Sequence, residues 1–110
     1  MTDGLHRLAE ERSLALHREV ARRLVDEPAL VEQAVERILA WRERGVLATD
    51  YALSWLALLR GPRDRLLQLL TQDDEPARAL RQTTPFTFVV GPRERWAIWR
   101  ATKARWEEQK

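Results

Sequence analysis

The side chains that most often carry catalysis are sparse in this sequence. Its two histidines, His6 and His17, fall eleven positions apart in one predicted helix, which places them about 16 Å apart along the helix axis. Because a shared metal ion or a proton relay needs a much shorter separation, we interpret both as helix-surface histidines. The chain has no cysteine, and it contains no glycine-rich phosphate loop, paired-histidine zinc motif or nucleophile elbow.

Several acidic residues are chain neighbours and could be considered as acid and base partners. The pairs are Glu10 and Glu11, Asp73 and Asp74, and Glu107 and Glu108. Neighbouring positions on a helix point in different directions, so these carboxylates cannot converge on one substrate atom. The sequence therefore predicts no catalytic site, no metal site and no cofactor, and we expect that the chain is not an enzyme.

The last predicted helix combines tryptophans with basic residues. Trp96, Trp99 and Trp106 fall on one side of it, with Lys103 among them and Arg100 at the margin. Such a surface could stack bases and neutralise phosphates. Tryptophans at helical spacing more often anchor a terminal helix to its core, and we favour that interpretation.

The charge balance argues against a protein that coats nucleic acid. The chain has 19 lysines and arginines against 17 acidic residues, which leaves a formal net charge of +2. Nearly all of the positive charge is arginine, whose forked guanidinium suits both carboxylates and phosphates. A helix-turn-helix would need base-reading side chains after the turn at residues 60–62, but the helix that follows is rich in leucine. A small DNA- or RNA-binding regulator is therefore the alternative function.

Proline, glycine and acidic residues divide the chain into helices. The segments GPRDRLL and GPRERW each place proline at the first helical position and an acidic residue two places later, where it complements the helix dipole. Between such starts, apolar residues recur at helical spacing, and we expect Thr49 to cap one helix and Gly45 to end another. The predicted helices are Leu5–Val25, Pro28–Arg44, Thr49–Arg60, Pro62–Thr71, Glu75–Arg81 and Pro92–Glu108.

Residues 1–110 should form one domain, a compact all-α bundle of five to six helices without a sheet. We expect Trp41 and Trp55 to be largely buried in it. Nothing at the amino terminus has the basic start and long apolar run of a signal peptide, and the longest apolar runs are far shorter than the roughly 20 residues that cross a bilayer. We therefore expect a soluble, cytoplasmic protein.

Arg12 interrupts an otherwise apolar stripe of the first predicted helix, between Leu8 and Leu16. A guanidinium in that place must reach a carboxylate or extend outward to water. We favour this structural role over direct contact with a partner, and the sequence identifies no counter-ion.

The stretch TTPFTFVVG, residues 83–91, differs from the charged helices around it. Pro85 biases Thr84 toward an extended backbone, and the β-branched residues favour the same conformation, so we predict an extended connector before the last helix. The apolar side chains of this connector must be covered. Either Phe86, Phe88 and Val90 pack under the tryptophans of the last helix, which we favour, or part of their surface is reserved for another protein, and the two can coexist.

Two runs of this sequence resemble small bacterial antitoxin-like proteins that are encoded beside a toxin gene, including genes for nucleotidyltransferase-type toxins. The runs are SLALHREVARRLVDEPALVEQAVERILAW, residues 13–41, and LRQTTPFTFVVGPRERWAIWR, residues 80–100. They share the order of helix, Pro-Phe connector and Trp-rich helix. The resemblance implies a helical protein that binds and neutralises a partner protein. Its most pattern-like positions are Pro85, Phe86, Arg93, Trp96 and Trp99.

We therefore predict a non-enzymatic protein-binding module, the antitoxin side of a toxin–antitoxin pair. Interface energy concentrates in a few aromatic residues and arginines, which directs attention to the connector and the start of the last helix. The predicted partner-binding residues are Phe86, Phe88, Arg93, Arg95 and Arg100. Trp96 and Trp99 are expected to hold that surface on the domain.

Overall fold

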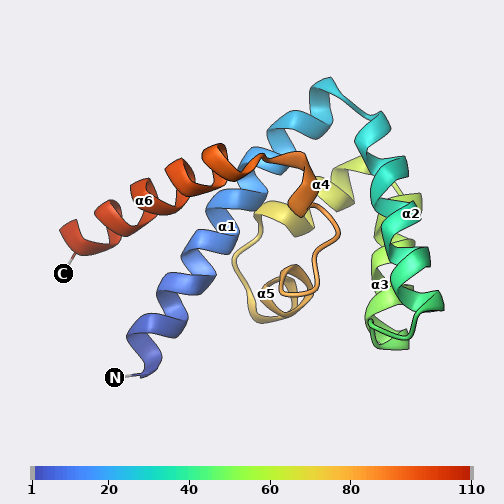
Figure 1. Ribbon diagram of the computed structural model, residues 1–110, viewed down its shortest axis with the longest axis horizontal. Helices are drawn as coiled ribbons and strands as arrows, with labels where there is room; N and C mark the ends of the chain where they lie inside the picture. Colours follow the sequence, from blue (N-terminus) through green and yellow to red (C-terminus); the bar gives the residue numbers. More distant parts are fainter. Residues whose placement is uncertain (1, 110) are drawn as a thin grey trace.

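The helix signals in the sequence produce a chain of α-helices. The computed structural model describes residues 2–109, and within them every regular element is helical (Figure 1). The elements are α1 (Thr2–Asp26), α2 (Ala29–Glu43), α3 (Thr49–Arg60), α4 (Arg63–Thr71), α5 (Glu75–Arg81), the 3-10 turn η1 (Thr87–Val89) and α6 (Pro92–Glu108). The predicted all-α bundle of five to six helices is confirmed.

The helix ends follow the predicted chemistry except at the starts of α3 and α4. Pro62, predicted as the first helical residue of α4, is its N-cap with a ψ of 137°, and the helix begins at Arg63. Gly45 has a φ of 70°, the left-handed conformation that glycine adopts most easily after a helix. Asp74 caps α5, because its carboxylate accepts a hydrogen bond from the Ala77 amide at 3.0 Å. The predicted cap of α3 is wrong. Ala48 occupies the capping position without a side-chain hydrogen bond, and Thr49 is already the first helical residue.

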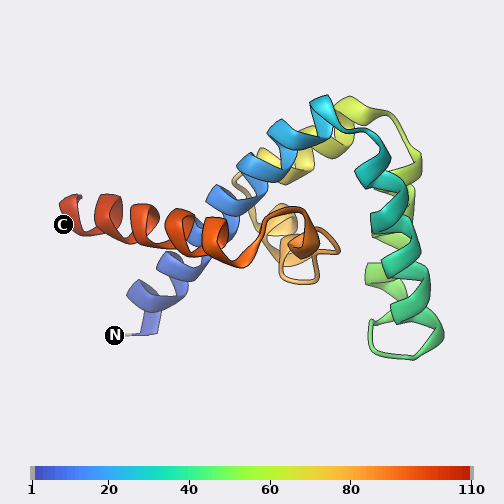
Figure 2. The ribbon, with the colours of Figure 1, turned by 45° about the horizontal axis from the view of Figure 1, so that its top comes forward.

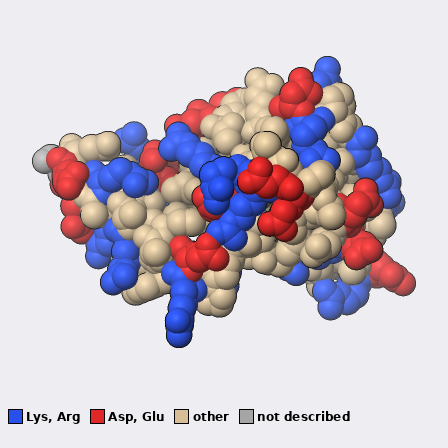
Figure 3. Space-filling view, turned by 90° about the horizontal axis from the view of Figure 1, so that it is seen from above, with Lys and Arg blue, Asp and Glu red and all other residues tan. Residues whose placement is uncertain are grey.

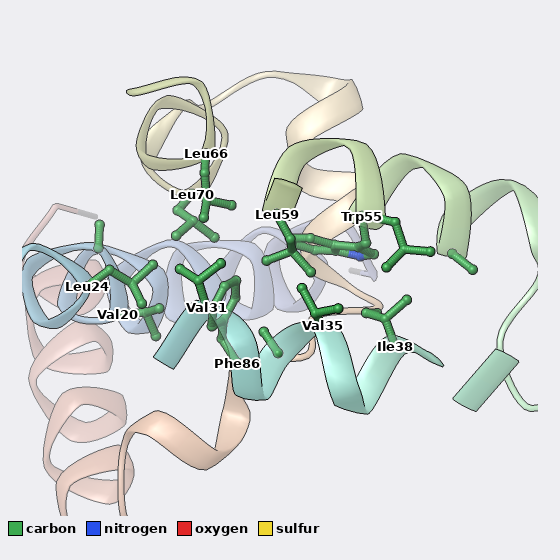
Figure 4. Close-up of a cluster of buried hydrophobic side chains, with 14 of the residues drawn as sticks. Val20, Leu24, Val31, Val35, Ile38, Trp55, Leu59, Leu66, Leu70 and Phe86 are labelled. Atoms are coloured by element: carbon green, nitrogen blue, oxygen red, sulfur yellow. The ribbon is translucent and has the colours of Figure 1, made fainter. Parts of the chain in front are cut away.

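The core lies where the carboxyl-terminal half of α1 meets α2, α3 and α4 (Figure 4). Trp55 is fully buried there, as predicted, and its indole N–H donates to the Thr83 hydroxyl at 3.0 Å. Phe86 is fully buried beside it, and the two rings meet edge to face with their centroids 6.1 Å apart. Other buried apolar residues of this cluster are Val20, Leu24, Val31, Ile38, Leu59, Leu66 and Leu70.

Trp41 is only partly buried, which corrects the expectation that both tryptophans would be largely buried. The α2–α3 hairpin projects from the rest of the molecule, so residues near its loop have neighbours mainly within the hairpin (Figure 2). Trp41 packs against the edge of the core cluster, and the Arg37 guanidinium lies 5.2 Å from its ring centroid.

The connector before α6 is not extended throughout, which corrects the predicted conformation. It turns at η1, where the Val89 amide donates to the Phe86 carbonyl at 3.1 Å. The Phe86 amide donates to the Thr84 hydroxyl, also at 3.1 Å. These bonds let the chain bend so that the Phe86 ring enters the core, a burial that outweighs the β preference of the segment.

The last helix packs along α1, and the amino-terminal half of α1 and the far end of α6 lie on the same side of the molecule (Figures 1 and 2). Among the described residues of α6, only Thr102 is buried. Arg23 of α1 fixes the start of α6, because it pairs with Glu94 and donates to the Val89 carbonyl at 2.8 Å. Most side chains of α6 are therefore left at the surface.

Candidate partner-binding surface

Two stacked tryptophans lie at the surface near the start of α6, one exposed and one partly buried. Trp96 is 53% exposed, and its ring stacks on that of Trp99 with the centroids 4.7 Å apart and the planes at 27°. Their spacing of three positions on one helix brings the two rings together. Pro92 and Arg95 complete a shallow hollow with them, and we call these four residues the tryptophan surface.

This arrangement corrects the expected role of the two tryptophans. Both were predicted to attach α6 to the domain, and Trp99 does contact α1. The Arg12 guanidinium lies 3.6 Å from the Trp99 ring centroid, a cation–π contact. Trp96 instead presents about half of its indole to solvent, which makes it a contact residue in its own right.

Arg12 meets an indole, whereas the sequence led us to expect a carboxylate partner or extension outward to water. Its Nε atom is buried without a hydrogen-bond partner, and burial lowers the pKa of the guanidinium below its ordinary value. The side chain still carries its charge, since an arginine keeps its proton at any physiological pH. A positive charge with an incomplete set of partners thus lies beneath the tryptophan surface.

The predicted partner-binding residues fall into two groups. Phe86 is fully buried in the core, so it is removed from the candidate surface. Phe88 is partly buried, and the Arg37 guanidinium lies 5.3 Å from its ring centroid. Arg93, Arg95 and Arg100 are exposed on α6, and of these Arg95 lines the tryptophan surface.

His17 is buried, which contradicts its interpretation as a surface histidine. It is 1% exposed, its Nδ1 lies 2.6 Å from the Ser13 carbonyl, and its Nε2 lies 2.8 Å from the Thr84 hydroxyl. A carbonyl can only accept, so Nδ1 carries the proton and Nε2 accepts from Thr84. Burial lowers the pKa of His17 to about 4, so the ring is neutral near pH 7 and ties the connector to α1.

Helical periodicity contained a signal for this burial. Position 17 lies three residues after Leu14 and three before Val20, both of which are buried. His6, by contrast, is exposed and pairs with Glu10 at 2.9 Å, as expected for a histidine on a helix surface.

Arg81 is a buried arginine that sequence reasoning missed. It is 2% exposed and donates to the carbonyls of Leu69 at 2.9 Å and Gln72 at 2.6 Å, where α4 ends. Its Nε atom has no hydrogen-bond partner, and burial lowers the pKa of the guanidinium. The available signal was its position four residues after the buried Ala77, on the inner face of α5.

A pocket of about 220 Å³ lies between α1, the end of α5 and α6, next to the tryptophan surface. Arg95 and Trp99 belong to both. We call this cavity the arginine pocket; it is lined by Arg12, Arg81, Arg95, Leu16, Ile98, Trp99, Ser13, His17 and Thr84.

The described part of the chain was also compared with the requirements of a metal site and of a membrane-spanning helix. Among the side chains that the structure describes, no group of three His, Asp or Glu residues is arranged to hold a metal ion. No helix among these residues has both the length and the apolar character needed to cross a membrane. Comparison with known proteins gives no match to this chain from family models, curated proteins or solved structures.

Proposed function

We propose that this chain is a non-enzymatic protein-binding module whose contact surface is centred on Trp96 and Trp99. The exposed, stacked tryptophan pair beside Arg95 is the observation that carries this proposal. Tryptophan and arginine are the residue types that dominate the energy of protein interfaces. A rigid aromatic pair also loses little conformational entropy on binding, because its rings are already held by Arg12 and by each other.

The chemistry around the pair defines the partner. Arg93, Arg95 and Arg100 are exposed on α6, so they favour acidic groups on the partner, whereas Lys103 is paired with Glu107 of the same helix. Glu94, the acidic residue at the start of the same helix, is paired with Arg23. The partner should therefore present an apolar patch for the tryptophans with carboxylates around it.

The resemblance to antitoxin-like proteins suggests which partner to try first. It implies a toxin encoded beside this gene, which the chain would bind and neutralise. A helical module with exposed aromatic residues and arginines supports such a role, since neutralisation requires a stable contact and no chemistry.

Binding of DNA or RNA is the alternative, favoured by the same basic and aromatic side chains of α6. Two observations weigh against it. Acidic side chains lie among the basic ones on the face seen in Figure 3, so no field of one sign extends over that face. Arg12 and Trp96 already pack on the Trp99 ring, which leaves the outer face of Trp96 as the main stacking platform for a base.

Co-purification with the product of the neighbouring gene tests the proposal. Trp96→Ala and Arg95→Ala should each weaken the complex without lowering the melting temperature, because both side chains are exposed. An interface hot spot is worth about 2 kcal/mol or more, so we expect a loss of roughly thirtyfold in affinity for Trp96→Ala.

Leu53→Ala is the matched control, because Leu53 is 49% exposed but lies on α3. It should bind as the unmodified chain does. If Trp96→Ala binds normally and Leu53→Ala does not, the interface is on the α2–α3 hairpin. If no complex forms with the neighbour's product, the antitoxin assignment is wrong.

A further inference from the structure

The arginine pocket collects positive charge without an acidic side chain in its wall. Three of its nine lining residues are arginines, and none is aspartate or glutamate. His17 adds no charge near pH 7, because burial lowers its pKa to about 4. The cavity therefore has a positive potential that no group lining it offsets.

Two of the three guanidiniums are charged groups with an incomplete set of hydrogen-bond partners. The Nε atoms of Arg12 and Arg81 are both buried and have no hydrogen-bond partner. The Arg81 side chain is 2% exposed, and one of its terminal nitrogens donates to two backbone carbonyls. A buried donor without a partner is costly, and a buried charge is more so. An anion bound among these arginines would supply the missing charge.

The remaining wall decides which anion fits. Leu16, Ile98 and Trp99 make it apolar, so a fully hydrated inorganic anion would lose its water without replacement. The Thr84 hydroxyl is already engaged by His17 and by the Phe86 amide. Phosphate needs many hydrogen-bond donors and should therefore bind poorly here. A carboxylate needs few and matches the paired N–H groups of a guanidinium.

We propose that the arginine pocket is a binding site for a small organic carboxylate with an aryl or branched alkyl group. The carboxylate lies among Arg12, Arg81 and Arg95, and the apolar group lies against Leu16, Ile98 and Trp99. This site does not depend on the proposed partner protein, because it is formed entirely within this chain.

Phenylacetate is a suitable probe, and phenylacetamide is its uncharged counterpart of the same shape. Titration of the isolated chain, followed by tryptophan fluorescence and by amide chemical shifts, should show saturable binding of phenylacetate. We expect phenylacetamide to bind at least about tenfold more weakly, since it lacks the charge. Shifted amides should cluster at residues 12–17, 81–84 and 95–99.

Two arginine variants distinguish binding in the pocket from non-specific attraction of anions to the basic surface. Arg95→Gln removes one exposed arginine of the pocket wall and should weaken phenylacetate binding severalfold. Arg93→Gln, two residues earlier on the same helix and outside the pocket wall, should not. Inorganic phosphate should bind no more tightly to the chain than to Arg95→Gln. Equal binding of phenylacetate and phenylacetamide, equal loss in both arginine variants, or no saturable binding of phenylacetate would overturn the proposal.

Discussion

Acidification should destabilise this protein through His17. The ring is 1% exposed and is enclosed by Ser13 of its own helix and Thr84 of the connector. Burial lowers its pKa from the ordinary value of 6.5 to about 4, and the nearby positive charge of Arg81 acts in the same direction. The folded chain therefore resists a proton that the unfolded chain accepts.

The sign and size of the effect follow from proton linkage. Between pH 6.5 and about pH 4 the unfolded state binds the proton and the folded state does not, so stability falls as the pH falls. The difference between 6.5 and about 4, at about 1.4 kcal/mol per pKa unit, amounts to about 3 kcal/mol. This contribution is fully present above pH 6.5 and is lost by about pH 4, a large change for a domain whose stability is typically about 5–15 kcal/mol.

Urea unfolding at about pH 7 and about pH 4.5 measures the loss directly. Unmodified protein and His6→Gln should both lose about 2–3 kcal/mol, whereas His17→Gln, which can still face Thr84 but cannot titrate, should lose much less. Glu19 acts mainly at lower pH: hydrogen bonds from Arg22 and Arg23 lower its pKa from the ordinary 4.5 to about 2, so its own contribution to stability is lost between about pH 4.5 and about pH 2. If His17→Gln shows the same pH dependence as the unmodified chain, the buried-histidine argument is refuted.

Three further predictions concern the core, a helix end and the alternative function. Trp55→Ala should cost about 3–5 kcal/mol in urea unfolding, and Trp41→Ala clearly less, because only Trp55 is fully buried. Gly45→Ala should cost about 1–2 kcal/mol, since alanine is strained at a φ of 70°, and an unchanged midpoint would contradict this. Fluorescence titration with single-stranded DNA should show weak binding. Sub-micromolar affinity whose logarithm falls against the logarithm of the salt concentration, with a slope of about one unit per neutralised phosphate, would favour the regulator.

Local sequence signals were sufficient for the helices, because each helix is marked by short-range chemistry. The predicted bounds of α5 and α6 match the structure, and that of α2 differs by one residue at each end. Those starts depend on Asp74, Pro92 and Pro28, whose effects act within a few residues. The prediction that Thr49 caps α3 failed because Ala48 occupies the capping position. Thr49 lies one position later, inside the helix.

The candidate site could not be predicted in the same way, because it depends on how α6 is rotated against α1. Sequence periodicity placed three tryptophans on one side of α6 but could not say which way that side faces. The contacts that set the rotation join residues far apart in sequence, namely Arg23 with Glu94 and Arg12 with Trp99. Phe86 was misplaced for a related reason, since its route into the core depends on the distant Trp55.

The tryptophan surface and the arginine pocket share Arg95 and Trp99, so occupation of one must affect the other. A carboxylate in the pocket competes with the Trp99 ring for Arg12, which lies 3.6 Å from the ring centroid. If the carboxylate draws Arg12 away, Trp99 loses its contact with α1 and the stacked pair becomes less rigid, which lowers affinity for a partner protein. Linkage requires the reverse to hold equally, so a partner that fixes Trp99 must weaken phenylacetate binding by the same factor. Titrating each ligand with and without the other measures both factors, and if neither ligand changes the affinity for the other, the two sites are independent and the coupling argument is wrong.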